Sequence, residues 1–119
     1  MENALNTLMD QAGALGCCVV DSSSGMMLAS MGGGPVDLEL AAAGNTEVVR
    51  AKLRTMKSLN LQDHIEDILI TLGKHFHLIR PLEKNPEMFI YLVIDKNKGN
   101  LALARRALTS ADHDIVPPR

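Results

Sequence analysis

The spacing of hydrophobic and polar residues predicts three helices. Apolar residues recur at intervals of three and four, the period of a helix with one buried face, in three segments: 2–12, 37–59 and 99–112. A residue able to cap the first turn stands near the start of each: Asn3, Asp37 and Asn100. Gly44 lies inside the middle helix, where glycine costs about 1 kcal/mol relative to alanine and would permit the close approach of another helix.

Five further segments have the composition of strands: 15–21, 26–31, 64–73, 74–82 and 88–95. The nearly continuous apolar run "MFIYLVID" is typical of a central strand that is covered on both faces. The resulting order, α-β-β-α-β-β-β-α, predicts an α+β domain with a five-stranded, mainly antiparallel sheet and helices on both faces. We expect a single domain over residues 1–113 and a loose tail over 114–119, where two prolines end regular structure.

Composition excludes several classes of function. The 119 residues are 46% apolar and carry a net charge of −2, as is typical of one globular domain. Aromatic residues make up 3% and there is no basic patch, so we expect no nucleic-acid partner. The N-terminus lacks the pattern of a signal peptide, and no apolar run is long enough to span a bilayer. We therefore predict a cytoplasmic protein without membrane insertion.

The motif "HFH" raises the question of a metal or catalytic site. In a strand, His75 and His77 would project on the same side of the sheet. The expected hairpin places Ile70 opposite His77 and Leu72 opposite His75, and neither is a metal ligand. We therefore predict no catalytic residue, no metal and no cofactor. A metal-dependent enzyme that uses His75 and His77 stays open as an alternative.

Other candidate motifs have structural explanations. Cys17 and Cys18 are adjacent in an apolar strand, so they point to opposite faces and are expected to be buried, unpaired core residues. "GGGP" (32–35) precedes a helix but lacks the Lys-Ser or Lys-Thr of a phosphate-binding loop, which favours a flexible connection. The serines of "DSSSG" fit a tight turn.

Three stretches resemble the Roadblock family of dynein light chains and its bacterial relatives: "VVDSSSGMMLAS", "DLELAAAGNTEVVRAKL" and "FIYLVIDKNKGNLALARRAL". The resemblance covers about residues 5–112 and implies a Roadblock/profilin-like sheet. It also implies a homodimer in which the third strands pair edge to edge and the middle helices pack across the same axis. Family members act as non-enzymatic adaptors or regulators, often of small Ras-like GTPases, which points to bacterial motility, polarity or signalling. A small-molecule sensor of PAS-like build is the alternative.

The sequence also suggests which residues would make these contacts. The middle helix is richer in Ala, Leu and Val than one sheet requires, and segment 64–72 would otherwise be an apolar, unpaired edge. The dimer interface is therefore predicted to contain Leu38, Ala41, Gly44, Asn45, Val48, Ile65, Asp67 and Leu69. Charged residues off the apolar stripe are predicted to bind the partner: Glu39, Glu47, Arg50, Arg54 and Lys57.

Overall fold

The structure is a computed structural model that describes residues 1–115. Its elements follow in the order α1 (Glu2–Met9), β1 (Ala14–Asp21), β2 (Met26–Gly32), α2 (Leu38–Ser58), β3 (Ile68–Thr71), β4 (His75–Pro81), β5 (Met88–Asp95) and α3 (Leu101–Asp114). The predicted order of helices and strands is confirmed. Of the helices described, none combines the length and apolar character needed to cross a membrane.

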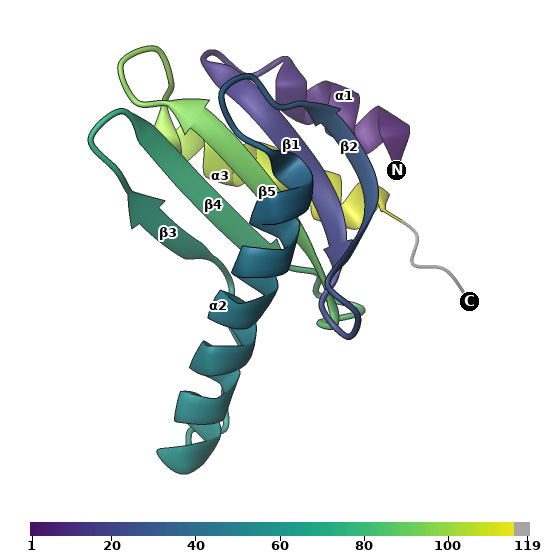
Figure 1. The fold of residues 1–119 in the computed structure, drawn as a ribbon, viewed down its shortest axis with the longest axis vertical. Coiled ribbons are helices and arrows are strands. Elements are labelled where there is room, and N and C mark those ends of the chain that lie inside the picture. Colours follow the sequence, from purple (N-terminus) through teal and green to yellow (C-terminus); the bar gives the residue numbers. More distant parts are fainter. Residues whose placement is uncertain (116–119) are drawn as a thin grey trace.

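The five strands form one antiparallel sheet in the order β2-β1-β5-β4-β3 (Figure 1). β5 lies at the centre, and all of its residues except Asp95 are buried, as its continuous apolar sequence predicted. β2 and β3 are the two edges. The order also separates β4 from β1 by one strand, so the histidines of β4 and the cysteines of β1 are not neighbours.

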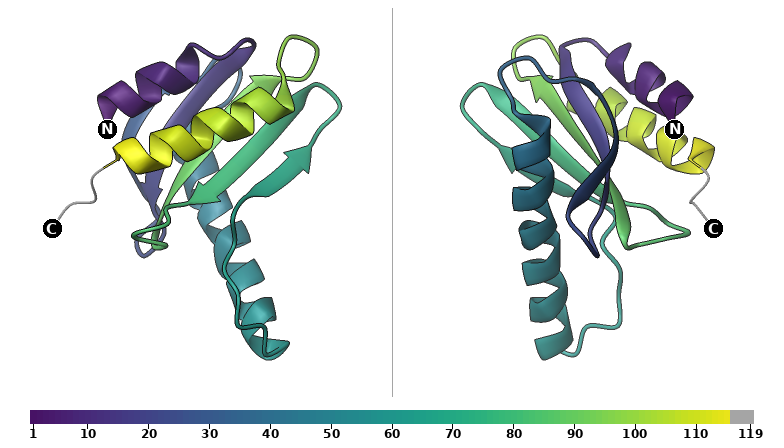
Figure 2. Two further views of the ribbon diagram at one scale, coloured as in Figure 1. Left: turned by 180° about the vertical axis from the view of Figure 1, so that it is seen from behind. Right: turned by 45° about the vertical axis from the view of Figure 1, so that its right-hand side comes forward.

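Helices cover both faces of the sheet (Figure 2). α1 and α3 pack side by side on one face over a core that includes Leu5, Leu92 and Leu108. α2 lies on the other face. Cys17 belongs to the first core and Cys18 to the second, which confirms that they point in opposite directions as buried, free thiols.

Two of the three predicted helix caps are present. The Asp37 carboxylate accepts a hydrogen bond from Leu40 N at 3.1 Å, and the Asn100 side chain accepts one from Leu103 N at 3.0 Å. The prediction for Asn3 is wrong, because α1 begins at Glu2 and its N-cap is Met1. Asn3 therefore lies inside the first turn, where its side chain makes no cap.

β3 is shorter than the predicted strand 64–73, for a reason that lies in β4. Leu72 N donates to the His75 carbonyl, so the odd-numbered residues of β4 direct their backbone polar groups towards β3. Continuing that register places Glu66 opposite Pro81, which has no N–H to donate. The pairing of Ile70 with His77 is confirmed, but pairing ends at Ile68.

The remaining boundaries differ slightly from expectation. α3 continues to Asp114, and Ile115 is buried in the core, so the domain extends past residue 113. Residues 116–119 of the predicted tail lie outside the described residues. The "GGGP" segment is anchored rather than flexible, because Gly33 N donates to Leu15 O at 2.8 Å and a Cβ on Gly16 would lie 2.6 Å from Gly33 N.

Candidate protein–protein interface

One side of the molecule leaves apolar surface uncovered. α2 packs mainly against β1 and β2, so β3 and the adjoining part of β4 have no helix over them on this side (Figure 1). Ile68 belongs to the core beneath α2, and strand alternation and register place Ile70 and His77 on the same side. We call this surface, made by α2, the loop before it and this side of β3 and β4, the α2–β3 face.

The exposed residues of α2 on this face are apolar. Leu40, Gly44 and Val48 follow one another at intervals of four and form a single stripe. Leu40 is 71% exposed and Val48 is 36% exposed. A Cβ on Gly44 would have no heavy atom of the described residues within 4 Å, so nothing in that part of the chain requires glycine there. The stripe faces outward and lacks a partner within residues 1–115.

The second half of α2 extends beyond the sheet (Figure 1). From Ala51 to Ser58, Met56 is the one buried residue, although Leu53 is also apolar. Surface helices of globular domains normally bury an apolar stripe against the core along their length. The second half of α2 does not do so against its own sheet. The protruding half therefore offers further surface for contact with another chain.

A shallow groove of about 460 Å³ runs between α2 and the sheet. It is lined by residues of four segments, namely Pro35, Val36, Asp37, Leu40, Ala41, Gly44, Asn45, Val48, His77 and Tyr91. Most of this lining is apolar, and His77 and Tyr91 of the sheet form its floor. There the Tyr91 hydroxyl lies 2.8 Å from His77 Nδ1.

Burial perturbs both polar groups at the floor of the groove. It raises the pKa of Tyr91 to about 12, partly offset by a hydrogen bond from Asn45, so the phenol keeps its proton. Burial also lowers the pKa of His77, and the neighbouring imidazole of His75 lowers it further. His77 Nδ1 shares its hydrogen bond with the phenol, so the second ring nitrogen is Nε2. That atom is buried and has no hydrogen-bond partner among residues 1–115.

The histidines do not assemble a metal site in the described chain. The rings of His75 and His77 stack with centroids 5.7 Å apart. Within residues 1–115, no group of three His, Cys, Asp or Glu side chains comes together in a geometry that could hold an ion. Burial raises the pKa of both Cys17 and Cys18 to about 12, which leaves them as thiols at neutral pH.

Comparison with solved structures identifies the fold. The sequence matches no protein-family model and no curated protein. Its structure is similar to MglB from Myxococcus xanthus, with a TM-score of 0.81 and 17% identity over 94% of this chain and 81% of that one. It is also similar to a Roadblock/LC7 domain from Streptomyces avermitilis, with a TM-score of 0.82 and 7% identity over 96% and 92% of the two chains. This chain has the Roadblock/LC7 fold. The gliding protein MglB from Thermus thermophilus matches less closely, at a TM-score of 0.73 and 16% identity over 96% and 89%.

In this Roadblock/LC7 fold, the residues predicted for the dimer interface separate into two groups. Ala41, Gly44, Asn45 and Val48 lie together along the groove.

The other four lie elsewhere. Leu38 is buried in the core beneath α2, and Leu69 packs against the other core, on the face of the sheet that α1 and α3 cover. Asp67 is paired with Arg105 of α3 at 3.1 Å, and Ile65 is half-buried beside a second groove. The residues predicted for the interface from the sequence did not include Leu40, His77 or Tyr91, which also line the groove. The four-residue spacing of Leu40, Gly44 and Val48 could have identified the first.

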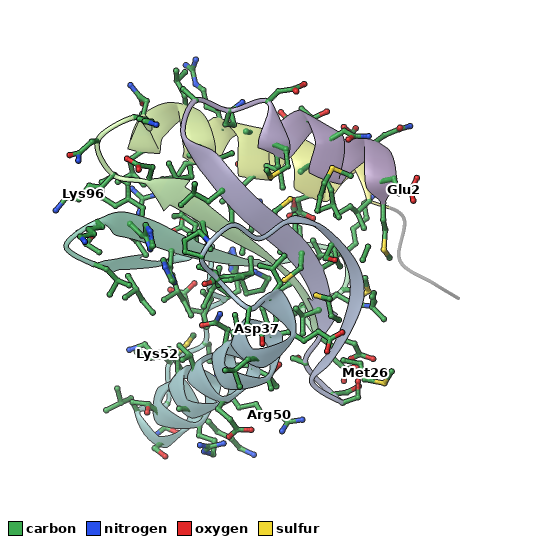
Figure 3. All side chains as sticks on the ribbon, turned by 45° about the horizontal axis from the view of Figure 1, so that its top comes forward. Glu2, Met26, Asp37, Arg50, Lys52 and Lys96 are labelled. Carbon is green, nitrogen blue, oxygen red and sulfur yellow. The ribbon has the colours of Figure 1, made fainter. Side chains whose placement is uncertain are left out.

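Among the residues predicted to bind a partner, Arg50 also makes contacts within the chain. Its guanidinium donates to Ser22 O at 2.7 Å and to Ser23 O at 2.9 Å, and it is paired with Glu47 at 3.3 Å. Arg50 thus fastens α2 to the β1–β2 turn, and its side chain is partly exposed. Figure 3 labels it on the flank of α2. The other four are exposed: Glu39, Glu47, Arg54 and Lys57.

Proposed function

We propose that this chain is a non-enzymatic adaptor or regulator that works as a homodimer joined through the α2–β3 face. Its partner is a small Ras-like GTPase in bacterial motility, polarity or signalling. The observation that carries the proposal is the uncovered apolar surface beside an edge strand. Such a surface is self-complementary about a two-fold axis, because an antiparallel edge pairs with a second copy of itself.

The apolar stripe supplies a driving force of the right size. Full burial of a leucine side chain contributes about 1.5–3 kcal/mol, so burying the exposed 71% of Leu40 contributes about 1–2 kcal/mol per subunit. Val48 and the outward side of β3 add to this. One of the similar structures is described as MglB with a tetrameric arrangement, so a chain of this fold forms higher assemblies (TM-score 0.81, 15% identity).

The dimer is tested by light scattering coupled to size exclusion at micromolar concentration. We expect wild type to have twice the 12.9 kDa mass of one chain. The double variant Leu40→Glu, Val48→Glu should elute as a folded monomer, because each carboxylate would have to be desolvated in the interface. Leu103→Glu is the matched control, since Leu103 is 52% exposed on α3, on the opposite face. A monomeric Leu103→Glu protein and a dimeric double variant would place the interface on the other side.

The GTPase partner is supported by the resemblance to the Roadblock family and by the likeness to MglB structures, one of them named a gliding protein. In a two-fold dimer, the exposed charges of α2 would recur on both sides of the axis, where they could steer a charged partner. Arg54 and Lys57 are the positive members of this set whose substitution leaves the chain's own described hydrogen bonds intact.

The test measures binding of the source organism's small Ras-like GTPases, loaded with a non-hydrolysable GTP analogue. We expect one of them to bind wild type, and Arg54→Glu, Lys57→Glu to weaken that binding about tenfold or more. Lys96→Glu, Lys98→Glu is the charge-matched control on the loop after β5 and should bind like wild type. If no such GTPase binds, the regulatory role is wrong while the dimer stands on its own test.

The PAS-like sensor keeps one observation in its favour. A second groove of about 700 Å³, which is within the range of small-molecule sites, opens between α2 and the segment before β3. Its lining includes the apolar residues Val49, Leu53 and Leu82 and the acidic residues Asp63 and Glu66. A reproducible rise in melting temperature with a metabolite panel, abolished by Leu53→Arg, would support sensing over adaptor function.

A further inference from the structure

The floor of the groove contains a polar group that the proposed dimer would enclose. We propose that His77 makes self-association through the α2–β3 face depend on pH, so that the face binds a second copy of this chain when His77 is neutral and releases it when His77 is protonated. This inference rests on the proposed homodimer.

The position of His77 allows its protonation to affect the stability of the dimer. It lies on β4, between the apolar stripe of α2 and the edge strand β3, which are the two elements that a second copy would cover. Its Nδ1 is already bonded to Tyr91, and its Nε2 is already out of contact with solvent without a partner. A second copy seated over the groove would remove the remaining access of the ring to water.

The groups that face His77 do not favour a positive charge. From its own strand comes His75, a second imidazole, and from β5 comes the neutral Tyr91. The residue opposite on β3 is Ile70, and the groove-lining residues of α2 are uncharged.

Asp37, from the loop before α2, is the one carboxylate among the described groove-lining residues. It already accepts a hydrogen bond from Leu40 N at 3.1 Å as the helix cap. In a dimer, each of the two His77 rings would meet this setting, so the cost of placing a charge there counts once per subunit.

The sign of the effect follows from linkage. The pKa of His77 is lowered from its ordinary 6.5 by burial first and by His75 second. Enclosure by a second copy would desolvate the ring further and lower this pKa again. A base whose pKa falls on association binds fewer protons in the dimer than in the monomer. The dimer is therefore tightest above the monomer's His77 pKa and weakens as pH falls through it. A further fall of one pKa unit would weaken the dimer about tenfold per subunit, or about a hundredfold for the pair.

The experiment measures the dimer dissociation constant by sedimentation equilibrium from pH 5.0 to 8.0. We expect the constant of wild type to rise at least tenfold between pH 7.5 and 5.0. His77→Phe retains a flat ring without a titrating group, and its constant should stay within threefold over the same range. His64→Gln is the matched control, because His64 is an exposed histidine away from the groove, and it should retain the pH dependence of wild type.

A second measurement keeps the proposal open to refutation if His77→Phe folds poorly. The pKa of His77 in wild type can be followed by NMR. It should be lower at protein concentrations above the dimer dissociation constant than at concentrations below it. Any one of three results would overturn the inference. The first is a dimer dissociation constant that does not change with pH, and the second is a pH dependence that persists in folded His77→Phe. The third is a His77 pKa that is equal in monomer and dimer. A wild-type protein that is monomeric at every pH would instead refute the homodimer itself, and this inference with it.

Discussion

Two ion pairs tie α3 to the β3–β4 end of the sheet, and they should contribute very differently to stability. Arg80 Nε lies 2.9 Å from the Asp112 carboxylate, and the two side chains are 16% and 4% exposed. The same carboxylate also accepts from the backbone N–H of Glu83. Arg105 and Asp67 are separated by 3.1 Å, but their side chains are 45% and 23% exposed.

Removing one partner of a buried pair leaves an unpaired charge in the interior. We expect Asp112→Ala to lower the free energy of unfolding by about 3–5 kcal/mol, because Arg80 and the Glu83 N–H both lose their acceptor. Asp67→Ala, the matched control, should cost about 0.2–1 kcal/mol, because water screens the more exposed pair. The double variant Arg80→Met, Asp112→Leu should recover much of the loss, since it removes both charges together.

Urea unfolding followed by circular dichroism measures these differences at one pH and protein concentration. A common concentration matters because association adds to apparent stability. If Asp112→Ala and Asp67→Ala lower stability equally, the distinction based on burial fails. If the double variant is as unstable as Asp112→Ala alone, the loss comes from packing and not from the stranded charge.

Further predictions concern α2 and the cysteines. Gly44→Ala should stabilise the folded subunit by up to about 1 kcal/mol in urea unfolding at low concentration, because the added methyl group meets nothing within the chain. If Gly44 marks a close helix contact, the same change should raise the dimer dissociation constant, and an unchanged constant would remove glycine from the interface. Cys17 and Cys18 should resist iodoacetamide at pH 8 in the folded protein and react after unfolding, because burial raises the pKa of each to about 12. Rapid alkylation of the native protein would contradict that burial.

The sequence was a good guide where local patterns determine structure. The apolar run 88–95 identified the central strand, and the adjacent cysteines were correctly assigned to opposite faces of the sheet. The Roadblock/LC7 fold followed from the order of elements and the resemblance, and it is confirmed.

The candidate interface was harder, because it depends on contacts between segments distant in sequence. The early end of β3 depends on a proline in the next strand, which the apolar pattern of 64–73 could not reveal. In the sequence, Arg50 has the pattern of a surface charge. Its hydrogen bond to the β1–β2 turn depends on Ser23, which lies 27 residues earlier in the chain. His77 was recognised as unusual, but its contact with Tyr91 and its place in the groove beside α2 required the fold.

The central claim is that β3 and α2 of one chain meet the same elements of a second, and amide hydrogen exchange at β3 tests it most directly. Ile68 and Ile70 direct their backbone N–H groups towards β4, so Leu69 and Thr71 direct theirs outward from the sheet edge. At wild-type concentrations above the dimer dissociation constant, we expect slow exchange at the amide of Leu69 or Thr71. In the Leu40→Glu, Val48→Glu variant, we expect fast exchange at both amides. Fast exchange at both amides in a protein shown to be dimeric would contradict pairing through this edge.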